Sequence, residues 1–195
     1  MREAQNIREV ESLGPSMMGF ICWDGSPRHV VSAPPYLPAC IRVGVFVDPT
    51  LEYIQARTAE LKLDRVQLHG RETPERCRQV AAATGLPVIK ALSVRTREDI
   101  EAHRPYQDAA HLLLFDTKCP TVGGSGRSFD WDVLQHYDGA LPFLLAGGIG
   151  PDDAERVRRF RHPRFAGIDL NSRFEASAGR KDPQLLRKFL NTLHA

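Results

Sequence analysis

Residues 141–153 read LPFLLAGGIGPDD and have the pattern of one βα unit. The apolar run Leu141–Ala146 is short and continuous, which is typical of a strand in a parallel sheet covered on both faces. Gly147 and Gly148 then allow a tight turn. Pro151 and the two aspartates after it are typical of a first helical turn, where the missing N–H of proline is tolerated and carboxylates interact favourably with the helix dipole. The stretch therefore predicts a strand, a loop and a helix in succession.

The same unit recurs along the chain. Further short apolar runs lie at Met17–Cys22, Ile41–Val47, Arg65–Leu68, Leu86–Leu92, His111–Phe115 and Phe165–Leu170. Capping side chains directly before prolines predict helix starts at Asp48-Pro49, Thr73-Pro74 and Asp182-Pro183. Gly14 and Gly85 predict helix ends. The predicted order is one helix followed by seven βα units.

This alternation determines the fold class. Strictly alternating strands and helices require a parallel sheet. An open doubly wound sheet and a closed (β/α)8 barrel both fit, although a barrel normally has eight strands and about 200 residues or more. The chain has 195 residues, and its sequence shows only seven strands. At roughly 100–200 residues per domain, this length predicts a single domain that spans residues 1–195.

Composition and charge argue against several classes of protein. The 26 basic and 24 acidic residues leave a net charge of +2, which is too balanced for an extended nucleic-acid surface or a polybasic membrane surface. No apolar run approaches the roughly 20 residues of a membrane span, and the first residues lack the apolar core of a secretion signal. The spacing of Cys22, Cys40, Cys77 and Cys119 fits neither a zinc site nor a disulfide framework. These features predict a cytoplasmic protein without a structural metal.

Loops after the predicted strands are the place to look for a ligand, because βα folds bind ligands at the carboxyl ends of their strands. Gly123–Gly126, Gly147–Gly148 and Asn171–Arg173 follow the last three apolar runs. Glycine N–H groups and helix N-termini bind anions. A tight turn alone would explain any one of these loops. Two of them follow the last two strands, where barrels often hold phosphate, and this favours a phosphate site.

Three further side chains are candidates for chemistry. Asp116 ends an apolar run, and a carboxyl in such surroundings can serve as an acid or base, although a loop or helix-cap aspartate fits the position as well. Arg28 could bind a carboxylate through its planar guanidinium, or lie on the surface. His69 could line the pocket or have a structural hydrogen bond. Cys22 lies inside an apolar run, so we expect it in the core.

Motifs follow one another in a set order over nearly the whole chain. They are Gly19-Phe20-Ile21 with Ser26-Pro27-Arg28, Val43–Val47, Val66–Glu72, Val88–Ala91, Leu114–Thr117, Gly123–Gly126 with Phe129-Asp130-Trp131, Leu145–Ile149, and Gly167-Ile168-Asp169 with Ser172, Glu175, Gly179 and Lys181-Asp182. No single motif decides the matter, but the ordered set closely resembles the phosphoribosylanthranilate isomerase family.

The resemblance implies a (β/α)8 barrel that catalyses an Amadori rearrangement in tryptophan biosynthesis without a cofactor or metal. N-(5-phosphoribosyl)anthranilate would become 1-(2-carboxyphenylamino)-1-deoxyribulose 5-phosphate. By this resemblance Asp116 is the general acid and Arg28 binds the anthranilate carboxylate. The remaining substrate-binding residues would be His69, Gly124, Ser125, Gly126, Gly147, Gly148, Asp169, Asn171, Ser172 and Arg173. The implied partner is this small molecule, and neighbouring enzymes of the pathway are candidate partners.

The sequence departs from the family pattern in two places. Family members open with a strand that ends in Lys-Ile-Cys-Gly, whose cysteine is the general base, and this sequence begins just after the equivalent position. We therefore expect a gap between the strands at Met17–Cys22 and Phe165–Leu170, low stability or solubility, and almost no activity. Arg173 stands where the family usually has glycine, so its side chain would either crowd the phosphate or help to hold it.

Three functions fit these observations. The first is an active isomerase whose true N-terminus lies upstream of Met1. The second is a non-catalytic relative that binds a phosphorylated ligand or a partner. The third is another phosphosugar isomerase or epimerase built on a barrel.

Overall fold

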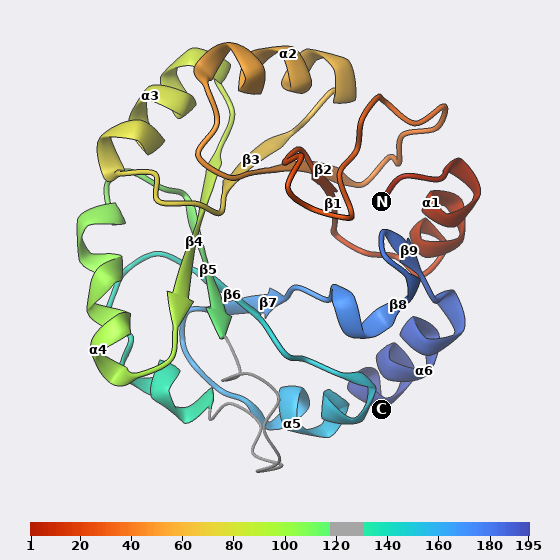
Figure 1. Cartoon of the computed structure of the whole chain (residues 1–195). Helices are drawn as coiled ribbons and strands as arrows, with labels where there is room; N and C mark the ends of the chain where they lie inside the picture. The colour runs from red at the N-terminus through yellow and green to blue at the C-terminus, as the bar shows by residue number, and fades with distance from the viewer. Residues whose placement is uncertain (118–130) are drawn as a thin grey trace.

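The computed structural model describes residues 1–117 and 131–195. Seven of the strands in these ranges form one parallel sheet in chain order (Figure 1). They are β1 (Met17–Ile21), β2 (Ile41–Phe46), β3 (Arg65–Leu68), β4 (Val88–Val94), β5 (Leu112–Thr117), β6 (Phe143–Ala146) and β7 (Phe165–Ile168). Each strand pairs in parallel with the next. Sequential order belongs to a (β/α)8 barrel, whereas a doubly wound sheet reverses its order at a switch point. The predicted TIM-barrel class is confirmed, with seven strands.

Helices surround the strands (Figure 1). The α-helices are α1 (Ala4–Glu11), α2 (Leu51–Leu61), α3 (Pro74–Thr84), α4 (Arg97–Ile100), α5 (Ala154–Arg159) and α6 (Pro183–His194). Short 3-10 helices lie at Glu101–Tyr106, Trp131–His136, Pro151–Asp153 and Ser172–Phe174. A small antiparallel hairpin, β8 (Glu175–Ser177) and β9 (Arg180–Lys181), follows β7. No helix in the described ranges is long and apolar enough to cross a membrane.

Both faces of the sheet are buried, which explains the continuous apolar runs. Leu112 and Leu114 of β5 belong to a small cluster inside the strands. Leu113 and Phe115, which alternate with them, belong to the large cluster that also contains buried residues of the helices. A strand that is apolar on both sides cannot show the alternating pattern of a half-exposed strand. Cys22 is buried in this large cluster, between the sheet and the helices, so its expected place in the core is confirmed.

The sheet has two edges. Strand pairing among the described residues ends at β1 on one side and at β7 on the other, so the gap expected between these strands is present. Side chains link the two edge regions. Asn6 of α1 exchanges hydrogen bonds of 2.9 and 2.8 Å with the backbone of Lys181 in β9. Helix α1 is therefore held against the hairpin that follows β7.

The first predicted βα unit is wrong, because residues 22–40 join β1 to β2 without a helix. Three prolines within Ala33–Pro38 lack the N–H groups that a helix interior requires. Instead, a side chain from another element binds some of the backbone carbonyl oxygens of this loop. The Arg57 guanidinium of α2 donates to the backbone oxygens of Val30 at 2.7 Å and Val31 at 3.2 Å.

Helix boundaries agree with local signals at most positions. Thr73 and Asp182 cap α3 and α6 by accepting hydrogen bonds from first-turn N–H groups, and Gly85 ends α3 with a left-handed φ of +68°. The prediction at Asp48 is wrong, because Thr50 caps α2 instead. Asp48 has a φ of +45°, and its carboxylate accepts a backbone N–H from the loop after β3. A contact from a neighbouring loop thus takes the place of the local cap.

Strands β4 and β6 start two residues later than their apolar runs. Strand β4 begins at Val88 and β6 at Phe143, each directly after a proline. Proline carbonyls still accept ladder hydrogen bonds at both places, but proline has no N–H to donate. The missing donor sets the first residue of each strand.

Candidate active site

Two predicted residues meet at the carboxyl end of the sheet. His69 directly follows β3 and Asp116 lies in β5, yet His69 Nε2 is 3.4 Å from Asp116 Oδ2. Both side chains are only partly exposed. The ring of His69 therefore faces the candidate acid, and its role in lining a pocket stays a prediction.

Gln67, which is not among the predicted site residues, determines which ring nitrogen of a neutral His69 carries the proton. Its Nε2 donates to His69 Nδ1 at 3.0 Å. A neutral His69 that accepts at Nδ1 carries its proton on Nε2, which faces Asp116. Residues two apart on a strand point to the same side, and this spacing is the signal that could have identified Gln67.

Asp169 extends this polar cluster. It follows β7, and its backbone N–H donates to the carbonyl oxygen of Leu145 at 2.9 Å. Burial raises the pKa of the Asp169 carboxyl, while the charges of Lys181 and His69 lower it and that of Asp116 raises it. Desolvation thus favours a protonated carboxyl beside the His69–Asp116 pair.

Arg28 lies in this region rather than loose on the surface, and Glu175 holds it. Its Nε lies 2.8 Å from Glu175 Oε2 and its Nη2 lies 2.7 Å from the same oxygen. Lys181 Nζ approaches Glu175 Oε1 at 3.2 Å. Burial alone would raise the pKa of Glu175, but the Arg28 hydrogen bond and the charge of Lys181 outweigh it and lower that pKa. Glu175 and Lys181 belong to the ordered motifs of the sequence, but only the structure shows that they contact each other and that Glu175 contacts Arg28.

The loops after β6 and β7 lie beside each other. Gly147 and Gly148 have left-handed φ angles of +84° and +68°, a conformation that disfavours other residues. A Cβ placed on Gly150 would lie 3.2 Å from Cδ of Arg173, so the Arg173 side chain lies against the glycine-containing loop.

Of the other residues predicted to bind phosphate, some lie in the described part of the chain and some lie outside it. Asn171 Oδ1 accepts from Lys181 Nζ at 2.7 Å, and Ser172 begins a short 3-10 helix. Gly124, Ser125 and Gly126 lie outside the described residues.

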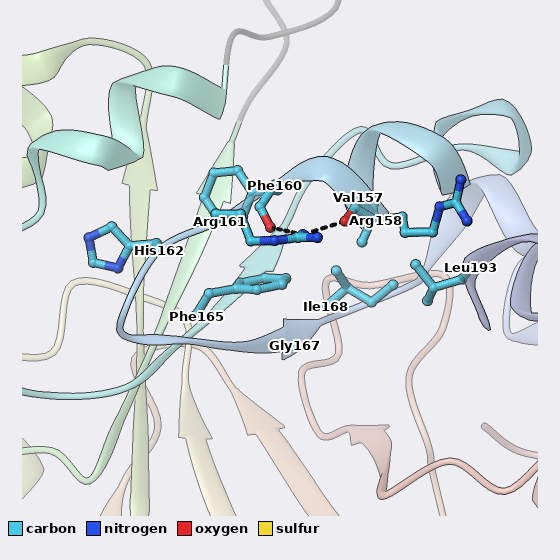
Figure 2. A pocket seen from close by; sticks show the side chains of 9 residues that line it. All are labelled: Val157, Arg158, Phe160, Arg161, His162, Phe165, Gly167, Ile168 and Leu193. Carbon is cyan, nitrogen blue, oxygen red and sulfur yellow. Dashed lines mark hydrogen bonds between the residues drawn. The ribbon is translucent and has the colours of Figure 1, made fainter. Parts of the chain in front are cut away.

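An apolar cavity of about 410 Å³ lies elsewhere, between α5, β7 and α6 (Figure 2). Its lining comprises Val157, Arg158, Phe160, Arg161, His162, Phe165, Gly167, Ile168 and Leu193. None of the predicted site residues lines it. The polar cluster at the strand ends is therefore separate from this cavity.

Comparison with known proteins identifies chains with the same sequence pattern. Residues 16–192 match the family model described as N-(5'phosphoribosyl)anthranilate (PRA) isomerase. The N-(5'-phosphoribosyl)anthranilate isomerase of Parabacteroides distasonis is 46% identical over 99% of this chain and 90% of its own length. That of Phocaeicola vulgatus is 45% identical over 99% of this chain and 94% of its own length.

Solved structures share the fold. The phosphoribosyl anthranilate isomerase from Thermotoga maritima superposes with a TM-score of 0.83 at 32% identity, covering 100% of this chain and 95% of its own. A phosphoribosyl anthranilate isomerase in complex with reduced 1-(o-carboxyphenylamino)-1-deoxyribulose 5-phosphate superposes with a TM-score of 0.80 at 27% identity. It covers 100% of this chain and 98% of its own.

Proposed function

The chain belongs to the N-(5'-phosphoribosyl)anthranilate isomerase family, and on this premise we propose that the polar cluster at its strand ends is the active site. The function of the chain is the isomerisation of N-(5'-phosphoribosyl)anthranilate in tryptophan biosynthesis. The expectation of almost no activity finds no support, since isomerases 45–46% identical match 99% of the chain. The low stability expected from open sheet edges stays a prediction.

The contact between His69 and Asp116 carries the assignment of the acid. Ring opening of the phosphoribosyl group requires a proton on the ring oxygen as the bond to C1 breaks, and we assign this proton to Asp116. His69 Nε2 lies 3.4 Å from Oδ2 of Asp116, and we assign the transferred proton to the other oxygen, Oδ1. A base then accepts the C2 proton as the iminium becomes an enolamine. The enolamine gains a proton at C1 as its 2-hydroxyl loses one, which gives the ketone. Protons and electrons balance without a cofactor.

Binding of the substrate is divided among several groups. Arg28 would meet the anthranilate carboxylate, and Asp169 would hydrogen-bond the sugar through a carboxyl whose pKa burial raises. Gly147, Gly148 and Arg173 would hold the phosphate, together with Gly124, Ser125, Gly126, Asn171 and Ser172. We also infer a cytoplasmic location and a small-molecule partner, with other enzymes of the same pathway as candidate neighbours.

The direct test is turnover by the purified chain. Conversion of N-(5'-phosphoribosyl)anthranilate to the deoxyribulose product, followed by chromatography, supports the proposal. A folded chain that binds this substrate without converting it would instead be the non-catalytic relative.

Replacing Arg28 by lysine tests the carboxylate site. Lysine keeps the charge but loses the planar guanidinium, whose five donors can bind Glu175 and a substrate carboxylate together. Arg28→Lys should therefore raise KM by about tenfold, equal to about 1.4 kcal/mol of binding. Binding of inorganic phosphate, measured by calorimetry, should stay unchanged. Arg42→Lys is the matched control, because Arg42 also binds a carboxylate, that of Asp64, but from the opposite end of β2. Equal weakening of phosphate binding would place Arg28 in the phosphate site.

A substitution of Arg173 tests whether its side chain helps to hold the phosphate or crowds it. Its side chain lies against Gly150, and we propose that its charge contributes to phosphate binding. A hydrogen bond to a charged group contributes about 1.5–3 kcal/mol, so Arg173→Gly should weaken inorganic phosphate binding by about tenfold or more. Arg180→Gly, which removes an exposed arginine of β9, is the control. Tighter phosphate binding by Arg173→Gly would show that the side chain crowds the site.

A further inference from the structure

We propose that the buried ion pair Lys90–Glu72 is a positioning device that holds His69 against Asp116, an inference that rests on the active site proposed above. Lys90 lies in β4, and its Nζ is 2.7 Å from Glu72 Oε2. The two side chains are only 1% and 2% exposed. Lys90 alternates with Ile89 and Ala91 of the inner cluster, so it points to the helix-covered face and not into the active site.

The ammonium group of Lys90 binds backbone carbonyl oxygens on both sides of His69. Lys90 Nζ donates to the carbonyl oxygen of Gly70 at 2.8 Å and lies 3.3 Å from that of Leu68. Together with Glu72, these acceptors use all three hydrogens of the ammonium group. The carbonyl groups immediately before and after His69 are therefore tied to one buried cation.

Glu72 completes the clamp from the other side. Its carboxylate accepts from the backbone N–H of Gly70 at 2.9 Å and from that of Asp48 at 2.8 Å. A Cβ on Gly70 would lie 2.5 Å from Asp48 Oδ1, so the loops after β2 and β3 are in close contact there. Asp48 is held in a left-handed conformation that is unfavourable for a residue other than glycine. One carboxylate thus fixes both loops.

The net contribution of a buried ion pair to stability is too small to explain why this pair is present. Desolvation of two charges offsets most of their attraction, and apolar residues of similar volume often serve a core equally well. What an apolar pair could not provide is the fixed position of the His69 backbone. His69 contacts Asp116, and a displacement of about 1 Å in a catalytic constellation can lower the rate about 100-fold.

The test separates position from stability. Lys90→Met leaves a buried carboxylate without its cation and should destabilise the fold. Adding Glu72→Gln removes that charge, so the double variant should recover much of the thermal stability. Its kcat should nevertheless stay about 10- to 100-fold below that of the unmodified chain, because no ammonium group holds the carbonyl groups. KM should change less than threefold, since the clamp touches none of the residues proposed to bind carboxylate or phosphate.

The matched control is Arg57→Met with Glu60→Gln. Arg57 of α2 is another buried cation that pairs with a carboxylate, that of Glu60. It donates to two backbone carbonyl oxygens, but these lie in the loop after β1. This double variant should lower stability comparably and leave kcat within about threefold. A double-mutant cycle with His69→Ala adds a second readout. If the pair acts through His69, its removal should lower kcat no further in the His69→Ala background.

The outcomes are distinct. A Lys90→Met/Glu72→Gln variant that regains both stability and kcat would overturn the inference and leave the proposed function intact. So would a full additional loss of kcat in the His69→Ala background. Absence of turnover in the unmodified chain would overturn the proposed function and this inference with it.

Discussion

We expect Asp116→Asn to lower kcat by about 10²- to 10⁴-fold, the range that a positioned general acid contributes. Asparagine has nearly the same shape and can still accept from His69, but it cannot donate a proton to the ring oxygen of the sugar. KM should change little, because the phosphate and carboxylate contacts stay in place. Steady-state kinetics with N-(5'-phosphoribosyl)anthranilate measures both constants.

Asp152→Asn provides the matched control, since it makes the same change at an exposed aspartate in the 3-10 helix before α5. It should keep kcat within about twofold. An Asp116→Asn variant with nearly normal turnover would remove Asp116 from the mechanism, and the partly buried Asp169 would become the next candidate for the acid.

The second large effect concerns stability. Phe143, the first residue of β6, is fully buried and has five aromatic neighbours among the described residues. Its ring centroid lies 5.1–6.4 Å from those of Phe115, Tyr137, Phe160, His162 and Phe165. Phe143→Ala should lower the free energy of unfolding by about 3–5 kcal/mol, from lost burial and a cavity that cannot close. Typical domains are stable by only about 5–15 kcal/mol, so this is a large share.

Denaturant unfolding followed by circular dichroism gives this free energy. Val31→Ala is the control, because Val31 is 80% exposed and its truncation should change stability by less than about 0.5 kcal/mol. A loss below about 1 kcal/mol in Phe143→Ala would mean that the aromatic cluster is loosely packed around β6.

Much of the site could be located from the sequence because strand ends are local features. The carboxyl ends of parallel strands meet at one edge, so Asp116, His69 and Asp169 were expected near each other without knowledge of the fold in detail. The sequence could not show that Glu175 occupies the guanidinium of Arg28. Nor could it show that Lys90 points away from the site, because both faces of β4 are apolar and alternation is absent there.

The caps at Thr73 and Asp182, the turn at Gly85 and the parallel order of the strands were determined by the sequence itself, since each depends on interactions within a few residues or on a repeated pattern. Asp48 has the same local signal as Thr73, yet it caps no helix. Its backbone N–H is taken by Glu72 and its carboxylate by the loop after β3, both more than 20 residues away. Only tertiary structure decides such a position, because a hydrogen bond from a distant segment competes with the local one and is invisible until the chain is folded.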